Sequence, residues 1–143
     1  MSWDVMVMKF EGARPTVEEL ENGDAIPIAL GPGDKVRKAI TKSLPDVDWS
    51  DPTWGTYTGD GFSIEFNAGA ALIYDLMLHV RGGGNAIDAI MKFATPNGWS
   101  VLDCSTDQFL DPQNPSQEGW EGFQKFRDKV VKKVTKKKKP GRR

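Results

Sequence analysis

The stretch from Gly61 to Thr95 constrains the fold most, because its pattern predicts two paired strands, a glycine turn and an amphipathic helix. Apolar and polar residues alternate over 62–67, which is the period of a strand with one buried face. Over 72–80 every second residue is apolar and the opposite face is mixed, which predicts its hairpin partner. The glycines at 82–84 allow a sharp change of direction. A helix with an apolar stripe is expected after Asn85, where a polar side chain can cap it. We expect the rest of the chain to cover this unit.

Other elements follow from similar patterns on both sides of that unit. A strand is predicted over Trp3–Phe10 and a short strand over 99–102. A helix is predicted over about 34–44, with its lysines and arginine outside. Apolar residues at helical spacing predict a last helix from Gln117 to about Thr135, which we expect to seal the domain.

The order strand, helix, strand, strand, helix, strand matches two right-handed split β-α-β units. It predicts a ferredoxin-like βαββαβ α+β fold: an antiparallel sheet with helices on one face, plus a C-terminal helix. The alternative is another α+β meander with a strand at 54–58 added at an edge. With helices on one face, we expect the other to show a mixture of apolar and charged residues: Val5, Val7, Lys9, Ser63, Glu65, Ile73, Asp75, Met77 and His79. Such a mixture suits a binding partner.

A chain of 143 residues is long enough for one domain with a real core, which we place at residues 1–135. The segment 136–143, KKKKPGRR, lacks apolar anchors and is predicted to be a disordered basic tail. The N-terminus has no long apolar run, so neither a signal peptide nor a membrane partner is expected. Cys104 is the only cysteine, which fits a reducing compartment and a cytoplasmic protein.

The formal net charge of -1 hides a strong asymmetry along the chain. Residues 1–124 hold 8 basic and 19 acidic residues, a charge of -11, whereas residues 125–143 hold 11 basic residues and one acid, a charge of +10. The basic end could solubilise the protein, contact nucleic acid or an anionic surface, or contact the acidic body. The acidic body would repel phosphate, and 72–80 lacks the aromatic RNA-binding pattern of an RRM sheet. Nucleic acid is therefore expected as a partner only through the tail.

An acidic and aromatic loop precedes the central unit. Asp46, Asp48 and Asp51 flank Trp49, and Trp54 follows. Two interpretations stay open: the tryptophans form a lid on the core while the aspartates cap turns, or the segment is a docking loop. The docking interpretation predicts that Trp49→Ala or Asp48→Lys weakens binding to a partner without unfolding the domain.

No catalytic or metal-binding pattern is present in the sequence. His79 and Cys104 are the only plausible nucleophilic pair, but the predicted strand order separates them by two strand spacings, roughly 10 Å. We expect Cys104 to be a small buried residue. The aspartates at 46–51 lack the glycine and distal glutamate of an EF-hand loop, and the turn at 81–85 is better explained as a strand-to-helix connection than as an anion site. We therefore predict no enzyme activity, cofactor or metal.

Four segments resemble those of small uncharacterised bacterial proteins of the kind encoded beside polymorphic toxins, as immunity proteins. They are GDGFSIEFN (59–67), LMLHVRGGGNAIDAI (76–90), NGWSVLDCSTDQFLD (97–111) and GWEGFQKFRDKV (119–130). The resemblance covers about residues 1–131 and transfers no catalytic residue. It implies a protein that binds and neutralises a cognate toxin domain by blocking its active site.

The candidate partner-binding residues come from the acidic loop and from the expected open sheet face. They are Asp46, Asp48, Trp49, Asp51, Trp54, Asp75, Met77 and His79. One alternative is a non-catalytic interaction or regulatory module whose basic tail contacts nucleic acid. Another is an enzyme, which a ligand-binding pocket containing His79 or Asp75 would support.

Overall fold

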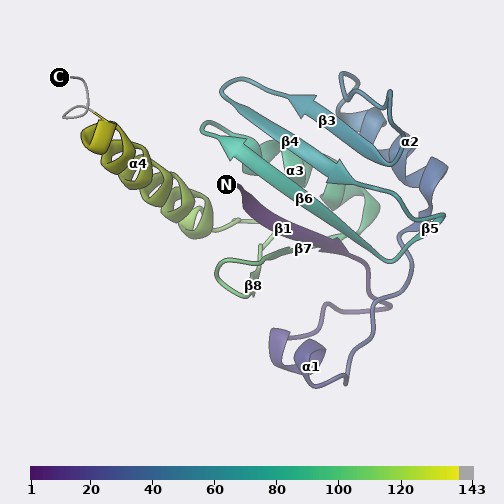
Figure 1. Ribbon diagram of the computed structural model, residues 1–143. Helices are drawn as coiled ribbons and strands as arrows, with labels where there is room; N and C mark the ends of the chain where they lie inside the picture. The colour runs from purple at the N-terminus through teal and green to yellow at the C-terminus, as the bar shows by residue number, and fades with distance from the viewer. Residues whose placement is uncertain (139–143) are drawn as a thin grey trace.

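The computed structural model describes residues 1–138 and is built on an antiparallel six-stranded sheet (Figure 1). Its strands are β1 (Trp3–Met8), β3 (Trp54–Thr58), β4 (Phe62–Asn67), β6 (Asp75–Gly82), β7 (Ser100–Asp103) and β8 (Gln108–Phe109). They lie in the order β3-β4-β6-β1-β7-β8. A second sheet pairs β2 (Gly31–Pro32) with β5 (Leu72–Ile73). The predicted α+β class with an antiparallel sheet is confirmed.

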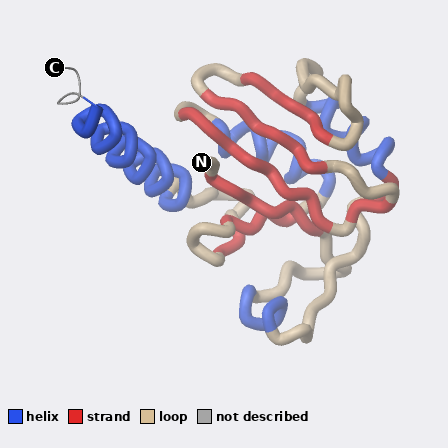
Figure 2. Tube along the Cα trace, viewed as in Figure 1, coloured by secondary structure: helices blue, strands red, loops and turns tan. Residues whose placement is uncertain are grey.

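The helices are α1 (Val17–Glu21), α2 (Gly33–Ser43), α3 (Ala86–Ala94) and α4 (Glu118–Lys138), with a 3-10 turn at Thr95–Asn97. Figures 1 and 2 show α2 and α3 on one face of the sheet and leave the other face without a helix. Between the sheet and these two helices lies the core. Its members include Val5, Val7, Val36, Ile40, Ile64, Phe66, Leu78, Val80, Ile87, Ile90 and Phe93. We call the opposite side of the sheet the open face.

The two faces of strand β1 are the reverse of the prediction: Val5 and Val7, expected on the open face, are buried. Val5 pairs directly with Leu78, and both are fully buried on the helix side. Because side chains alternate along a strand, Asp4 and Met6 then lie on the open face. Both sets of β1 residues are mostly apolar, with Asp4 as the only charged residue of the strand, so the alternation marks the solvent side only weakly. Ile73, also expected on the open face, is buried as well.

Both edges of the sheet are formed by short additional strands. The strand predicted as a possible edge, β3, pairs with β4 and lies at one end of the sheet. Outside it, the backbone of Asp48 forms an isolated bridge with Thr56. At the other end, β8 pairs with β7. The open face is therefore wider than the four central strands.

Helix α4 packs on the body only at its beginning. Trp120 is buried, with its ring 5.3 Å from that of Trp3, and its indole nitrogen donates to the Gly84 carbonyl at 3.0 Å. Farther along, Phe126 and Val134 are 58% and 46% exposed, and Figure 1 shows the helix extending away from the sheet.

The expectation that the last helix seals the domain along its length is thus wrong beyond its first turns. The helix also runs to Lys138, past the expected end at Thr135. The rest of the predicted disordered tail, 139–143, lies outside the described residues. Within residues 1–138, none of the helices combines the length and apolar character needed to cross a membrane.

Candidate functional site

A row of polar side chains crosses the open face from the edge of the sheet to its centre. The register pairs Thr56 with Glu65, Glu65 with His79, and His79 with Asp4, on strands β3, β4, β6 and β1. Residues directly opposite one another in antiparallel strands share a face of the sheet. These side chains are therefore neighbours, although they come from four distant parts of the sequence.

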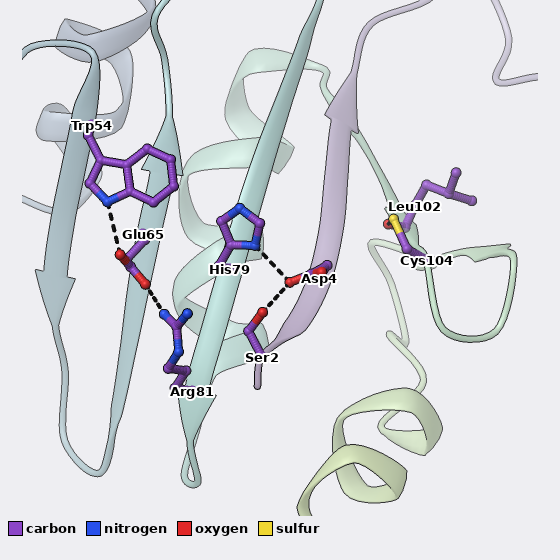
Figure 3. Close-up of polar contacts among 8 residues, drawn as sticks. All are labelled: Ser2, Asp4, Trp54, Glu65, His79, Arg81, Leu102 and Cys104. Carbon is purple, nitrogen blue, oxygen red and sulfur yellow. Dashed lines mark hydrogen bonds and ion pairs between the residues drawn. The ribbon is translucent and has the colours of Figure 1, made fainter.

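Asp4 is the acceptor for two side chains in this row. The Nδ1 atom of His79 lies 2.8 Å from Asp4 Oδ1, and the Ser2 hydroxyl donates to the same oxygen at 2.5 Å (Figure 3). An ionised carboxylate only accepts hydrogen bonds, so the ring of His79 donates to it from Nδ1. Asp4 thereby fixes the orientation of the imidazole ring.

Trp54 connects the edge of the sheet to the same cluster. Its indole nitrogen donates to Glu65 Oε2 at 2.9 Å, and the other oxygen of Glu65 forms an ion pair with Arg81. The indole ring also stacks on the imidazole of His79, with centroids 5.7 Å apart and planes inclined by 22°. Figure 3 shows the contacts of Glu65 with Trp54 and Arg81 beside the contacts of Asp4 with His79 and Ser2. Trp54 remains 37% exposed, so a large aromatic surface is held in place yet accessible.

An apolar row lies next to the polar one. Met77 pairs directly with Met6, and Met6 pairs with Leu102 on β7. All three side chains are partly exposed. Methionine adapts its shape to a partner, and methionine, tryptophan and arginine are enriched in protein interfaces. The open face thus combines an aromatic and polar cluster with an adaptable apolar band.

Trp49 lies on the other side of the sheet. Its ring is 5.7 Å from that of Phe66, and its indole nitrogen donates to Thr41 on α2 at 3.0 Å. The ring lies so close over Gly55 that a Cβ atom there would be 2.3 Å from it. These contacts fit the lid interpretation, in which Trp49 joins α2 to the sheet.

The aspartates of the loop form turns. Asp48 Oδ1 accepts from the backbone nitrogen and the hydroxyl of Ser50, at 2.8 and 2.5 Å. Asp51 Oδ1 accepts in the same way from Thr53, at 3.0 and 2.6 Å. These hydrogen bonds, first those from the side-chain hydroxyls, lower the pKa of both carboxyl groups. Such bonds are the usual stabilisers of tight polar turns.

The eight candidate residues therefore divide into two groups. Those in the loop before β3 are Asp46, Asp48, Trp49 and Asp51, and those on or beside the open face are Trp54, Asp75, Met77 and His79. Asp48 lies between the groups, because its backbone pairs with Thr56 at the end of the polar row. The sequence-based selection missed Asp4, Glu65 and Arg81. Only the register of β1, β4 and β6 shows that Asp4 and Glu65 lie on either side of His79 and that Glu65 meets Arg81.

Cys104 differs from its expected environment. It is exposed rather than buried, just beyond the end of β7. Partial desolvation raises the pKa of its thiol, with smaller contributions from the charges of Asp4, Asp103 and Asp107. Strand β1 separates it from β6 and from His79, whose Nδ1 is bonded to Asp4. The thiol is therefore neutral at physiological pH and receives no activation from the histidine.

Over the described part of the chain, no three or more His, Cys, Asp or Glu side chains are grouped so that they could hold a metal ion. Comparison of the chain with protein-family models, curated proteins and solved structures found no match. Any functional assignment must therefore be argued from the site and from the sequence resemblance.

Proposed function

We propose that this protein is a non-catalytic immunity protein that binds a cognate bacterial toxin domain and blocks its active site. The open face is its docking surface. The observation that supports this most is the cluster formed by Trp54, Glu65, Arg81, His79 and Asp4, which holds an exposed aromatic ring in one orientation on a sheet face without a helix. Fixed aromatic anchors surrounded by polar groups are typical hot spots of protein interfaces.

The charge of the body supports the same kind of partner. Residues 1–124 have a formal charge of -11. Such a surface accelerates encounter with a basic protein and disfavours acidic ones. A toxin domain that acts on nucleic acid is expected to have a basic active-site cleft, because it must hold phosphates. The proposed partner is therefore a basic toxin domain.

The contacts of the histidine favour binding over catalysis. A nucleophile is activated when its proton lies within hydrogen-bond reach of a histidine nitrogen, while a carboxylate orients the ring from the other side. Ser2 instead donates to Asp4, the carboxylate that already holds His79. The aromatic ring of Trp54 also stacks on the imidazole. His79 is thus proposed to act as a recognition group.

We also infer a ferredoxin-like core for this binding protein. The strands β4-β6-β1-β7 are consecutive in the sheet, and α2 and α3 lie in the connections from β1 to β4 and from β6 to β7. Two split β-α-β units give this order. Strands β3 and β8 are then additions at the two edges.

Growth rescue tests the proposed function. The genes that neighbour this one are searched for a toxin domain, which is expressed in bacteria with and without this protein, and the two proteins are then purified together. We expect growth to be restored and a stable complex to form. A matched variant, Trp54→Ala, should rescue poorly, whereas Ile26→Ala, which alters an exposed side chain outside the sheet, should rescue fully. Unabated toxicity in the presence of the folded wild-type protein would refute the proposal.

A second candidate function, contact with nucleic acid, is favoured by the exposed lysines of α4. Four of them are Lys125, Lys129, Lys132 and Lys133, the last three beyond the hydrogen bond from Arg127 to the Gly82 carbonyl. A cationic helix of this kind would bind phosphates in a salt-dependent way. Retention on DNA or RNA that weakens with salt, falls when these four lysines are replaced by glutamine, and falls further after deletion of residues 136–143 would support this function over the first.

A further inference from the structure

A cavity of about 560 Å³ opens where the N-terminus, the turn after β7 and the beginning of α4 meet. Its lining includes Ser2, Asp4, Cys104, Glu118, Gly122 and Phe126. Asp4 also holds His79 on the open face, so the cavity adjoins the proposed docking surface. Its volume lies in the range of sites that bind small molecules.

The charges around the cavity favour a cation. Its charged lining residues are Asp4 and Glu118, and no lysine, arginine or histidine is among the described residues that line it. The raised pKa of Cys104, to which nearby carboxylates contribute after desolvation, is consistent with a negative potential here. The start of α4 contributes a positive partial charge, but Glu118 and Glu121 lie in its first turn and offset it.

An accessible aromatic ring completes one wall. Phe126 lines the cavity and is 58% exposed. The ring of Phe123 already contacts two neighbours. Trp120 stacks on it with ring centroids 5.7 Å apart, and the guanidinium carbon of Arg127 lies 5.7 Å from its centroid. A guanidinium over an aromatic ring is therefore a contact that this helix already makes. Phe126 offers a second ring for the same interaction.

Gly122 keeps the cavity open. A Cβ atom at this position would have nothing within 4 Å, so no close packing requires a glycine there. Gly119, one turn earlier, differs, since its Cβ would collide with the Asp103 carboxylate. Glycine inside a helix is unfavourable compared with alanine. The bare backbone at Gly122 is best explained by the space that it leaves for a bound group.

We infer that this cavity binds the side chain of an arginine, with its guanidinium between the Phe126 ring and the carboxylates of Asp4 and Glu118. Arginine fits better than lysine because its planar group both stacks on an aromatic ring and pairs with carboxylates through several N–H donors. This inference rests on the proposed function in one respect: the arginine belongs to the toxin domain that docks on the open face.

A titration followed by ¹H-¹⁵N NMR tests the inference with N-acetylarginine amide as the ligand. N-acetylcitrulline amide, which has nearly the same shape but no charge, is the control. We expect saturable shifts of the amides of 104–106 and 119–123 with the arginine compound only. Gly122→Leu, which fills the cavity while favouring the helix, should abolish them. Glu118→Gln and Phe126→Ala should each weaken binding about three- to fivefold.

Thr135→Leu changes no charge and lies on the same helix away from the cavity, so it should leave the arginine titration unchanged. Equal shifts with citrulline, no saturation with arginine, or full binding by Gly122→Leu would each overturn the inference. Growth rescue separates it from the proposed function. If Gly122→Leu rescues as well as the wild type, the toxin places no arginine here, although the function stands. If the wild type binds arginine but does not rescue, the function fails and the cavity remains a binding site.

Discussion

The indole ring of Trp54 reaches across strand β4 to stack on the imidazole of His79 on β6, with ring centroids 5.7 Å apart. Between them, Glu65 of β4 accepts a hydrogen bond from the indole nitrogen. An edge strand and a central strand are thereby connected on the open face. The exposed aromatic surface is fixed before any partner arrives, which reduces the entropy lost on binding.

The two tryptophans around the acidic loop should respond differently to truncation. Trp49→Ala removes a ring packed on Phe66 and should cost about 3 kcal/mol of unfolding free energy. Trp54→Ala removes a partly exposed ring and should cost about 1 kcal/mol. Urea unfolding followed by far-UV circular dichroism measures both. Equal losses would show that Trp49 is not a lid on the core. The contacts of Trp49 with Phe66 and Thr41 thus argue against the docking interpretation, which predicts that Trp49→Ala weakens binding without unfolding the domain.

Two glycines should respond to alanine with opposite signs. Gly55→Ala places a Cβ atom against the Trp49 ring and should destabilise the domain by about 1–3 kcal/mol. Gly122→Ala adds a methyl group to open space in a helix and should stabilise it by about 0.5–1 kcal/mol. Thermal unfolding of the two variants beside the wild type checks the signs. A stabilised Gly55→Ala would contradict the observed packing.

The thiol of Cys104 should react slowly for an exposed cysteine. Its raised pKa leaves less thiolate than a free cysteine has at the same pH, and the thiolate is the reactive form. Alkylation by iodoacetamide should therefore require a higher pH than alkylation of free cysteine. Asp4→Asn removes one of the charges that raise the pKa and should shift the profile toward lower pH. Identical profiles for the protein and free cysteine would rule out this environment.

Acid should weaken the loop before β3. Asp48 has a folded-state pKa below its ordinary value of 3.8, because Ser50 donates to the carboxylate. The contribution of Asp48 to stability is therefore complete above that value and is lost as the pH falls through the folded-state pKa. Melting temperatures of the wild type and Asp48→Asn should differ near neutral pH and converge once the pH has fallen below the folded-state pKa of Asp48. A difference that persists at low pH would contradict this assignment.

Local patterns in the sequence were enough to predict the elements at the centre of the fold. The alternation over 62–67 and the apolar spacing after Asn85 correspond to β4 and α3. Both signals are reliable because charged or polar residues mark the solvent side. In β1 both sides are apolar, and only Asp4, in phase with Met6, indicates which side meets solvent. The phase of that strand was therefore predicted wrongly.

The site was harder to predict because its members meet through long-range pairing. Asp4 and His79 are 75 positions apart, and nothing in either segment specifies their register. Trp49 and Trp54 lie close in sequence yet on opposite sides of the sheet. The apolar spacing of α4 predicted burial along its length, but burial also requires a facing surface, which the body provides only for the first turns.

The most direct test of docking through the open face is the affinity of the purified protein for the toxin domain that it is proposed to neutralise. Isothermal titration calorimetry compares the wild type with Trp54→Ala and with Ile26→Ala, whose side chain is exposed outside the sheet. We predict a loss of about 30-fold or more for Trp54→Ala, the size expected of a hot spot, and no change for Ile26→Ala. Wild-type affinity in folded Trp54→Ala would contradict the proposal.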